Sequence, residues 1–273
     1  MLADGKVDID LIVPHNRTLC ATVLLEFDES VVGKFGHALS DFWRMTADDS
    51  REFTNTVWLM ISDCLEQNGK LRLGDSSSPW KPFTATQHVT VDPPGFYWDA
   101  SIRLAPLLSL RVRDLFCDCE GTASVSLFSV IPLDRANSSP ELEEAELMRY
   151  LAEAVWYPTA LLPAAGIEWE SIDDRTAKTT VEDGDVSASL TFSFNEDDEV
   201  TRVHADRYRR LDDGYESMPW SGYWRNYETR NGVRVPTEGK VVWHLPDGDV
   251  HAWQGRVTDI QYDDFLSCRG RGR

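Results

Sequence analysis

The chain has 273 residues, of which 42% are hydrophobic, enough for one large β-rich domain or a main domain with an N-terminal extension. Its 46 acidic residues outnumber 27 lysines and arginines, so the formal net charge is −19. A field of this sign repels nucleic-acid phosphates and anionic lipid surfaces, which excludes nucleic acid as an expected partner.

The acidic residues are mainly aspartates, and lysine is scarce. The chain contains 28 Asp, 18 Glu, 21 Arg and 6 Lys. This balance resembles that of cytosolic proteins of extreme halophiles, although an ordinary acidic protein from a high-GC organism would show a similar excess. The first residues, MLADGKVDIDLIVPH, are too acidic for a signal peptide, and no apolar run is long enough to span a membrane. We therefore expect a cytoplasmic protein without a transmembrane segment.

In the first sixty residues, KVDIDLIV alternates like a strand, and CATVLLEF is a second candidate strand. Residues 30–45 carry apolar side chains at the spacing of an amphipathic helix. After residue 57, short alternating segments are separated by proline or glycine, as in antiparallel sheets. They include residues 65–73, 80–92, 96–104, 109–121 and 122–133, and we expect roughly nine or ten strands in all. Asn231-Gly232 is typical of a tight hairpin turn.

One helix interrupts the strands. Ser139 is a good N-cap, Pro140 suits the first helical position, and the glutamates that follow suit the positive end of the helix dipole. The apolar stripe predicts buried positions at Leu147, Leu151 and Val155. The opposite face carries Glu146, Arg149 and Glu153, which predicts an ion-pair network on the helix surface.

Signatures of common catalytic and metal sites are absent from the sequence. There is no GxSxG elbow, no P-loop and no GxGxxG, so no catalytic residue and no cofactor are expected. His244 and His251 flank a Pro246–Asp249 turn, but two ligands are too few for a metal site. The five cysteines do not form a disulfide framework. Cys117 and Cys119 are expected to share one face of a strand.

Several phrases, among them LEQNGKLRLG, WKPFTATQ, PPGFYWDA and GIEWESIDDRTAKTT, resemble an uncharacterised bacterial and archaeal family. It is catalogued as a domain of unknown function, numbered six-five-four-four or the related six-nine-two-zero. The resemblance covers about residues 61–264 and implies one main β domain there. Residues 1–60 are then an N-terminal extension, and residues 265–273 are a basic tail that we expect to be disordered.

A second resemblance concerns the end of the chain. VPTEGKVVW followed by GRVTDIQYD is similar to the closing strands of bacterial lipoprotein carriers. This resemblance implies a mainly β (α+β) fold, in which a curved antiparallel sheet or half-barrel carries one main helix on its concave face. It also implies an apolar or lipid-like ligand.

Aromatic residues next to polar ones are the remaining candidates for a site, because indole and phenol rings line both cores and ligand cavities. Core packing is the alternative. An enzyme of unrecognised type, using carboxylates such as Asp99 or Glu168, and a scaffold that contacts a partner through residues 1–60 are further alternatives. The candidate ligand-binding residues are Trp98, Trp156, Tyr208, Trp220, Trp224, Arg225 and Trp253.

The charge excess predicts salt dependence. Self-repulsion at −19 destabilises the folded chain at low ionic strength, and molar KCl screens it. We expect the Tm to rise clearly between low salt and molar KCl, measured by differential scanning fluorimetry. A Tm that is flat or falls over this range would contradict the halophilic interpretation.

Overall fold

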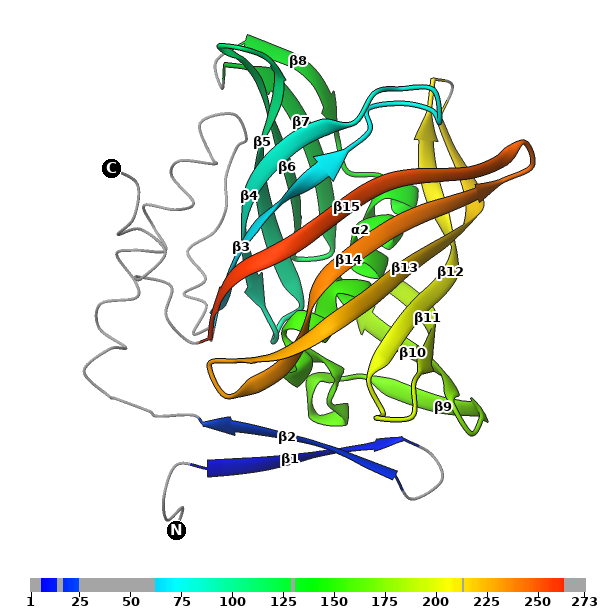
Figure 1. Cartoon of the computed structure of the whole chain (residues 1–273). Helices are drawn as coiled ribbons and strands as arrows, with labels where there is room; N and C mark the ends of the chain where they lie inside the picture. The colour runs from blue at the N-terminus through cyan, green and yellow to red at the C-terminus, as the bar shows by residue number, and fades with distance from the viewer. Residues whose placement is uncertain (1–5, 14–16, 25–61, 129–130, 213, 263–273) are drawn as a thin grey trace.

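The computed structural model describes residues 6–13, 17–24, 62–128, 131–212 and 214–262. A thirteen-stranded antiparallel sheet curves around one α-helix, α2, which lies on its concave face (Figure 1). The expected open, curved antiparallel sheet is confirmed, but the expected strand number was too low. The helix expected near residues 30–45 and the basic tail lie outside the described residues.

Strands that are far apart in the sequence are neighbours in the sheet. The order in the sheet is β8-β7-β6-β5-β4-β3-β15-β14-β13-β12-β11-β10-β9, and β1 and β2 form a separate antiparallel pair. The strands are β1 (Lys6–Val13), β2 (Arg17–Leu24), β3 (Ser62–Leu71), β4 (Lys81–Thr90), β5 (Gly95–Ala105), β6 (Leu108–Cys117), β7 (Glu120–Leu127), β8 (Ile131–Ala136), β9 (Glu168–Asp173), β10 (Thr176–Asp183), β11 (Val186–Phe194), β12 (Val200–Leu211), β13 (Gly214–Arg230), β14 (Val233–Leu245) and β15 (Gly248–Gln261).

The sheet consists of two arms that meet at its centre. The last strand, β15, pairs with β3, with Gly255 opposite Gly69. We call β3–β8 the first arm and β9–β15 the second arm. Each arm ends in a free edge, β8 or β9, and the chain segment between these edges contains α2. The helix is therefore the connection that crosses the open side of the half-barrel.

The strand number was underestimated because both edge strands were missed. Residues 122–133 were interpreted as one strand, whereas they contain β7 and the start of β8. Residues 109–121 contain a turn, since Asp118 and Cys119 both have positive φ angles, of 53° and 64°. The prediction that Cys117 and Cys119 share a strand face is therefore wrong, because Cys119 lies in the turn between β6 and β7.

Helix α2 (Pro140–Glu153) begins as predicted. The Ser139 hydroxyl accepts a hydrogen bond from the Leu142 N–H at 3.3 Å. The helix continues into three short 3-10 segments, η2 (Ala154–Trp156), η3 (Pro158–Leu161) and η4 (Pro163–Ala165). The predicted apolar stripe is confirmed, with Leu147 and Leu151 fully buried and Val155 buried.

Contacts across the opening join the two arms. The backbone N–H of Cys119, at the β6–β7 turn, donates to Asp183 Oδ2 at 3.0 Å, at the β10–β11 turn. Arg210 of β12 pairs with Asp134 of β8 at 2.8 Å. The second pair is half-exposed and contributes at most about 1 kcal/mol, so apolar burial under α2 is the larger stabilising contribution.

The burial of Leu151 gives a direct test of this packing. We expect Leu151→Ala to lower the free energy of unfolding by about 2–5 kcal/mol, because it leaves a cavity between α2 and the sheet. Urea denaturation measures this value. Leu133→Ala, on an exposed edge-strand side chain, is the matched control and should change stability by less than about 0.5 kcal/mol. Equal effects of the two changes would contradict the packing described here.

Candidate functional site

Aromatic rings form a continuous chain on the concave face. Ring centroids lie 4.9 Å apart for Trp156 and Trp224, 6.3 Å for Trp156 and Trp253, and 5.9 Å for Trp253 and Phe83. Phe83 also lies 5.9 Å from Trp98. The Trp156 indole donates to the carbonyl of Pro236 at 2.9 Å. We call these five residues the aromatic cluster; it combines four of the predicted ligand-binding residues.

Glycines make room for these rings. Gly69, Gly255 and Gly239 are direct neighbours across β3, β15 and β14, in one row. A Cβ atom at Gly239 would overlap the Trp224 ring, and one at Gly255 would overlap the Trp253 ring. Two indoles can therefore lie flat on the backbone of the sheet, and the interior at this level is filled with aromatic side chains.

A buried polar seam lies along α2, where side chains of the helix meet polar side chains of both arms. Arg149 of α2 pairs with Asp114 of β6 at 2.6 Å and with Glu153 at 2.9 Å, and its guanidinium lies 4.9 Å from the Phe96 and Trp98 rings. The polar seam consists of Gln67, Gln87, Asp114, Glu146, Arg149, Glu153 and Arg207.

Amide groups extend the polar seam across the first arm. Gln87 donates to Glu153 at 2.7 Å, Gln67 donates to Gln87 at 3.0 Å, and the Trp98 indole donates to Gln67 at 3.0 Å. Both glutamines are buried. Trp98 is thus fixed by a hydrogen bond, and it links the polar seam to the aromatic cluster.

The electrostatics of the polar seam are unbalanced. Three carboxyl groups face two guanidinium groups, and burial raises the pKa of Asp114 and raises that of Glu146 to about 7. The Asp114 charge adds to the effect on Glu146, whereas Arg207, 3.7 Å away, and Arg149, 3.9 Å away, oppose it. Glu146 Oε2 has no hydrogen-bond partner among the described residues. Near neutral pH the Glu146 carboxyl is therefore partly protonated.

The sequence placed Glu146, Arg149 and Glu153 on the solvent face of the helix, and this prediction is wrong. A sheet that packs against one side of a helix would leave that face exposed, but here the sheet curves around α2. Glu146 is only 6% exposed. The ion-pair network exists, but it lies inside the half-barrel.

The other predicted residues do not join the aromatic cluster. The Trp220 ring lies 5.5 Å from the Arg207 guanidinium, under the polar seam. Tyr208 lies farther along β12, opposite Ser217. Arg225 is exposed on the convex face and pairs with Glu238 at 2.8 Å. The predicted set is thus divided between the two faces of the sheet.

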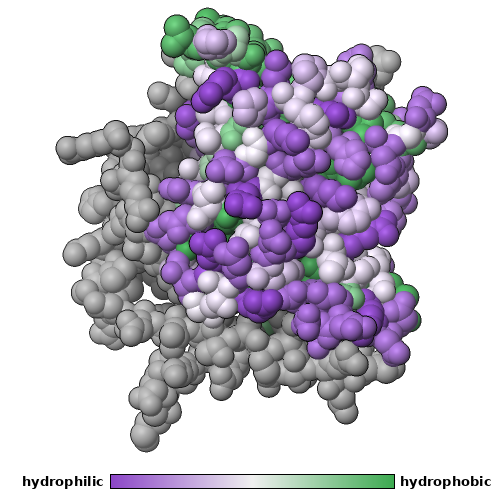
Figure 2. Space-filling model, in the orientation of Figure 1, coloured by the Kyte–Doolittle hydropathy of each residue, from purple (hydrophilic) through white to green (hydrophobic). Residues whose placement is uncertain are grey.

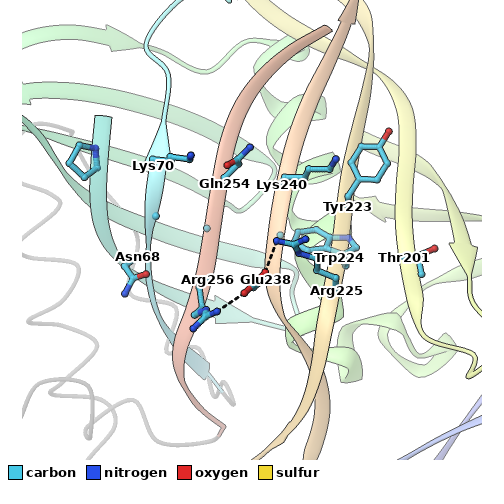
Figure 3. A pocket seen from close by; sticks show the side chains of 14 residues that line it. Asn68, Lys70, Thr201, Tyr223, Trp224, Arg225, Glu238, Lys240, Gln254 and Arg256 are labelled. Carbon is cyan, nitrogen blue, oxygen red and sulfur yellow. Dashed lines mark hydrogen bonds and ion pairs between the residues drawn. The ribbon is translucent and has the colours of Figure 1, made fainter. Parts of the chain in front are cut away.

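A basin with a volume of about 830 Å³ lies on the convex face (Figure 3). Its floor is the backbone at Gly69, Gly255 and Gly239, and two outward rows of side chains form its walls. One row is Lys70, Gln254, Lys240 and Tyr223, and the other is Asn68, Arg256, Glu238 and Arg225. Apart from Trp224 and Arg225, the basin residues were not predicted from the sequence, because they come from six strands.

A serine, a histidine and an aspartate meet on the same face. Ser221 Oγ lies 3.0 Å from His244 Nε2, and His244 Nδ1 lies 2.8 Å from Asp249 Oδ1. The connectivity is that of a hydrolase triad, but Ser221 is fully buried and its oxygen also contacts Arg202 and His204. Ser221 lies within β13, where neighbouring strands occupy the backbone N–H groups, so no oxyanion hole is formed. The arrangement supports a structural link between β12, β13 and β14.

The carboxylates suggested for an enzyme do not converge. Asp99 of β5 pairs with Arg111 and lies 3.9 Å from Arg113, whereas Glu168 is exposed on β9 in the other arm. Among the described residues, no group of three or more histidine, cysteine or acidic side chains could hold a metal ion. Cys64 is disulfide-bonded, and Cys117 and Cys119 carry free thiols. Burial raises the pKa of the Cys117 thiol to about 12 and that of Cys119 to about 11, which makes both poor nucleophiles.

Exposed apolar side chains gather at the far end of the first arm. They are Leu107, Phe128, Ile131 and Leu133, and hydrophobic surface is visible there around β8 (Figure 2). The scaffold alternative expected such a patch within residues 1–60, whose side chains lie outside the described part of the chain. Nothing in the described residues shows what would cover the patch at β8.

Comparison with known proteins places this geometry in a family. The sequence model of DUF6920, a family of unknown function, matches residues 54–262. The chain belongs to the DUF6920 family. The match confirms the predicted membership in a family of unknown function, and it decides between the two family numbers. None of the curated proteins compared matches this DUF6920 chain.

Two solved structures are distantly similar to this DUF6920 protein. A LolA superfamily protein from Nitrosomonas europaea has a TM-score of 0.42 and 13% identity over 77% of this chain and 90% of its own. A β-barrel-like protein of the DUF1849 family from Brucella abortus has a TM-score of 0.20 and 10% identity over 75% and 99%. Both similarities are too distant to add to what the geometry of the chain shows. Within the described residues, no helix has both the length and the apolar character needed to cross a bilayer.

The pKa of Glu146 gives a pH-dependent prediction. Its folded-state pKa of about 7 exceeds the unfolded value of 4.5, so the folded state binds more protons between these values and its stability falls as pH rises. Glu146→Gln keeps the shape and removes the titration. We expect this variant to lose part of the decline in Tm between pH 5 and pH 8, and to be more stable than the parent at pH 8.

The control for this experiment is Glu141→Gln, in the first turn of the same helix, which removes one charge and leaves Glu146 in place. Asp114, Glu153, Arg149 and Arg207 face Glu146 and are unchanged in both variants. If Glu141→Gln flattens the pH profile as much as Glu146→Gln does, the effect is one of net charge and the assignment to Glu146 is wrong.

Proposed function

We propose that this DUF6920 protein is a non-enzymatic binding protein that takes an apolar, lipid-like molecule into the half-barrel. The observation that supports this proposal is the position of α2, which fills the concave face and whose contact with the first arm includes buried ion pairs and hydrogen bonds. The ligand would bind against the aromatic cluster after the first arm and α2 separate. This proposal assigns the ligand-binding role to four of the predicted residues, Trp98, Trp156, Trp224 and Trp253.

The two sides of α2 differ in how strongly they hold the helix. Toward the second arm, α2 packs along β11, whose Ala188, Leu190 and Phe192 are buried, and Arg207 of β12 donates to the Ala145 carbonyl at 3.0 Å. Burial of such apolar surface is favourable at about 25 cal/mol per Å². Toward the first arm, buried ion pairs contribute little net stability, because desolvation of the charges offsets their attraction. We therefore infer that α2 and the first arm separate at the lower cost in free energy.

Opening at the polar seam would hydrate its charges and expose aromatic walls. Phe83, Phe96 and Trp98 lie on the first arm and face the interior, where all three are buried. Aromatic and aliphatic surfaces with few polar groups are typical of sites for lipid-like molecules. The cross-opening pair of Arg210 and Asp134 is half-exposed and would not prevent separation.

A fluorescent long-chain fatty-acid analogue tests this function. We expect binding in the micromolar range with quenching of tryptophan emission, since three indoles of the aromatic cluster lie together. Trp156→Leu removes one indole from the interior and should weaken binding several-fold. Glu146→Gln stabilises the closed polar seam and should weaken binding at pH 8 without loss of fold.

The matched control is Trp80→Leu, which changes a half-buried tryptophan outside the aromatic cluster. It should leave the affinity unchanged. If the analogue does not bind up to about 100 μM, or if Trp80→Leu and Trp156→Leu weaken binding equally, the interior is a solid core and the proposal fails.

Cellular location and the halophilic interpretation stay predictions. The Asp-rich, Lys-poor balance supports a salt-rich cytoplasm.

A further inference from the structure

The convex basin concentrates positive charge on an acidic protein. Its charged lining consists of Lys70, Lys240, Arg225 and Arg256 against one carboxylate, Glu238, which leaves a formal excess of three positive charges. The whole chain carries −19 and has only six lysines, two of which line this basin. Such local enrichment focuses an attractive field for anions where the average field repels them.

The arginines and lysines of the basin have different partners. Glu238 lies 2.8 Å from Arg225 and 2.5 Å from Arg256, so one carboxylate holds both guanidinium groups in place. The hydrogen bond from Arg256 lowers the pKa of Glu238, which keeps this carboxylate ionised at neutral pH. Neither Lys70 nor Lys240 is ion-paired in the described part of the chain. In a protein with 46 acidic residues, two unpaired neighbouring lysines are an unexpected arrangement.

Aromatic rings hold the two ammonium groups instead. Lys70 Nζ lies 4.9 Å from the centroid of Trp80, and Lys240 Nζ lies 4.5 Å from that of Tyr223. A cation–π contact orients the ammonium group but leaves its N–H donors available for an anion. The lysines are therefore partly positioned before any ligand binds.

The strand register places the two lysines on opposite sides of the Gln254 side chain. Gln254 of β15 lies opposite Lys70 of β3 on one side and opposite Lys240 of β14 on the other. With neighbouring strands about 4.8 Å apart, the two lysine Cα atoms are about 10 Å apart, a span that two flexible lysine side chains can bridge by converging on one group. The Gln254 amide supplies an N–H donor between them. Figure 3 shows the side chains of Lys70, Gln254 and Lys240 in one row, above the ion pairs that Glu238 forms with two arginines.

We propose that this basin binds a phosphate monoester group, with Lys70 and Lys240 compensating its two negative charges and Gln254 donating a hydrogen bond. Two unpaired ammonium groups match a dianion better than a carboxylate, and lysine binds phosphate as a point charge. The volume of about 830 Å³ leaves room for the organic part of the ligand, beside Arg225 and Arg256. A free phosphorylated metabolite and a phosphatidic acid headgroup share this chemistry. The basin is on the face opposite α2, so this inference is independent of the proposed function.

Calorimetry and vesicle flotation test the site on the full chain. One arm titrates glycerol 3-phosphate, with glycerol as the neutral control. The other arm floats the protein with phosphatidylcholine vesicles that contain or lack phosphatidic acid. We expect binding of at least one phosphate source, weakened at least tenfold in the double variant Lys70→Gln, Lys240→Gln and less in each single variant. Added salt should weaken binding as well.

Lys178→Gln is the matched control, because it removes the same charge from an exposed position on β10. It should leave binding unchanged. Binding of glycerol 3-phosphate alone assigns the site to a free metabolite, and flotation with phosphatidic acid alone assigns it to a headgroup. No binding of either probe overturns the proposal, as does binding that the double variant retains or that Lys178→Gln weakens equally.

Discussion

The pairing of the last strand, β15, with the first strand of the sheet, β3, determines the rest of the architecture. The first and last strands of the sheet in chain order are neighbours at its centre. Its free edges, β8 and β9, therefore come from the middle of the sequence. The segment that joins two such edges must cross the open side of a curved sheet. Residues 140–165 make this connection, and their helix consequently lies inside the half-barrel (Figure 1).

Enclosure of α2 explains its unusual composition. A helix on an open sheet needs one apolar stripe, and its remaining face stays in water. Here both sides of α2 meet an arm of the sheet, so its polar face is buried with Glu146, Arg149 and Glu153 on it. In the first arm, Asp114 forms an ion pair with Arg149, Gln87 donates a hydrogen bond to Glu153, and Gln67 donates to Gln87. The contacts of α2 consequently differ in chemistry: it meets β11 through buried apolar side chains, β6 through the ion pair of Arg149 and Asp114, and β12 through Arg207, 3.7 Å from Glu146.

Local features of the fold could be predicted from the sequence, and features that depend on curvature could not. Ser139 and Pro140 specify the start of α2 through short-range hydrogen bonding and a fixed φ, and Asn231-Gly232 specifies the β13–β14 turn. The aromatic residues were identified because indole and phenol rings line both cores and ligand cavities, but their grouping could not be predicted. The row of Gly69, Gly255 and Gly239 becomes visible only when the register of three strands is known. The same holds for Lys70 and Lys240, which are 170 residues apart and share one neighbour, Gln254.

A single row of glycines thus separates the aromatic interior of the half-barrel from the charged basin on the convex face. On its concave side the missing Cβ atoms of Gly239 and Gly255 admit the rings of Trp224 and Trp253, while on its convex side the same backbone forms the floor of the basin. The residues before and after each glycine point outward. Lys240 and Gln254 therefore lie on one wall of the basin, and Glu238 and Arg256 lie on the other. A Cβ atom at Gly239 would overlap the Trp224 ring, so a larger residue there requires Trp224 to move. Trp224 belongs to both sides, because its ring is part of the aromatic cluster and the residue also lines the basin.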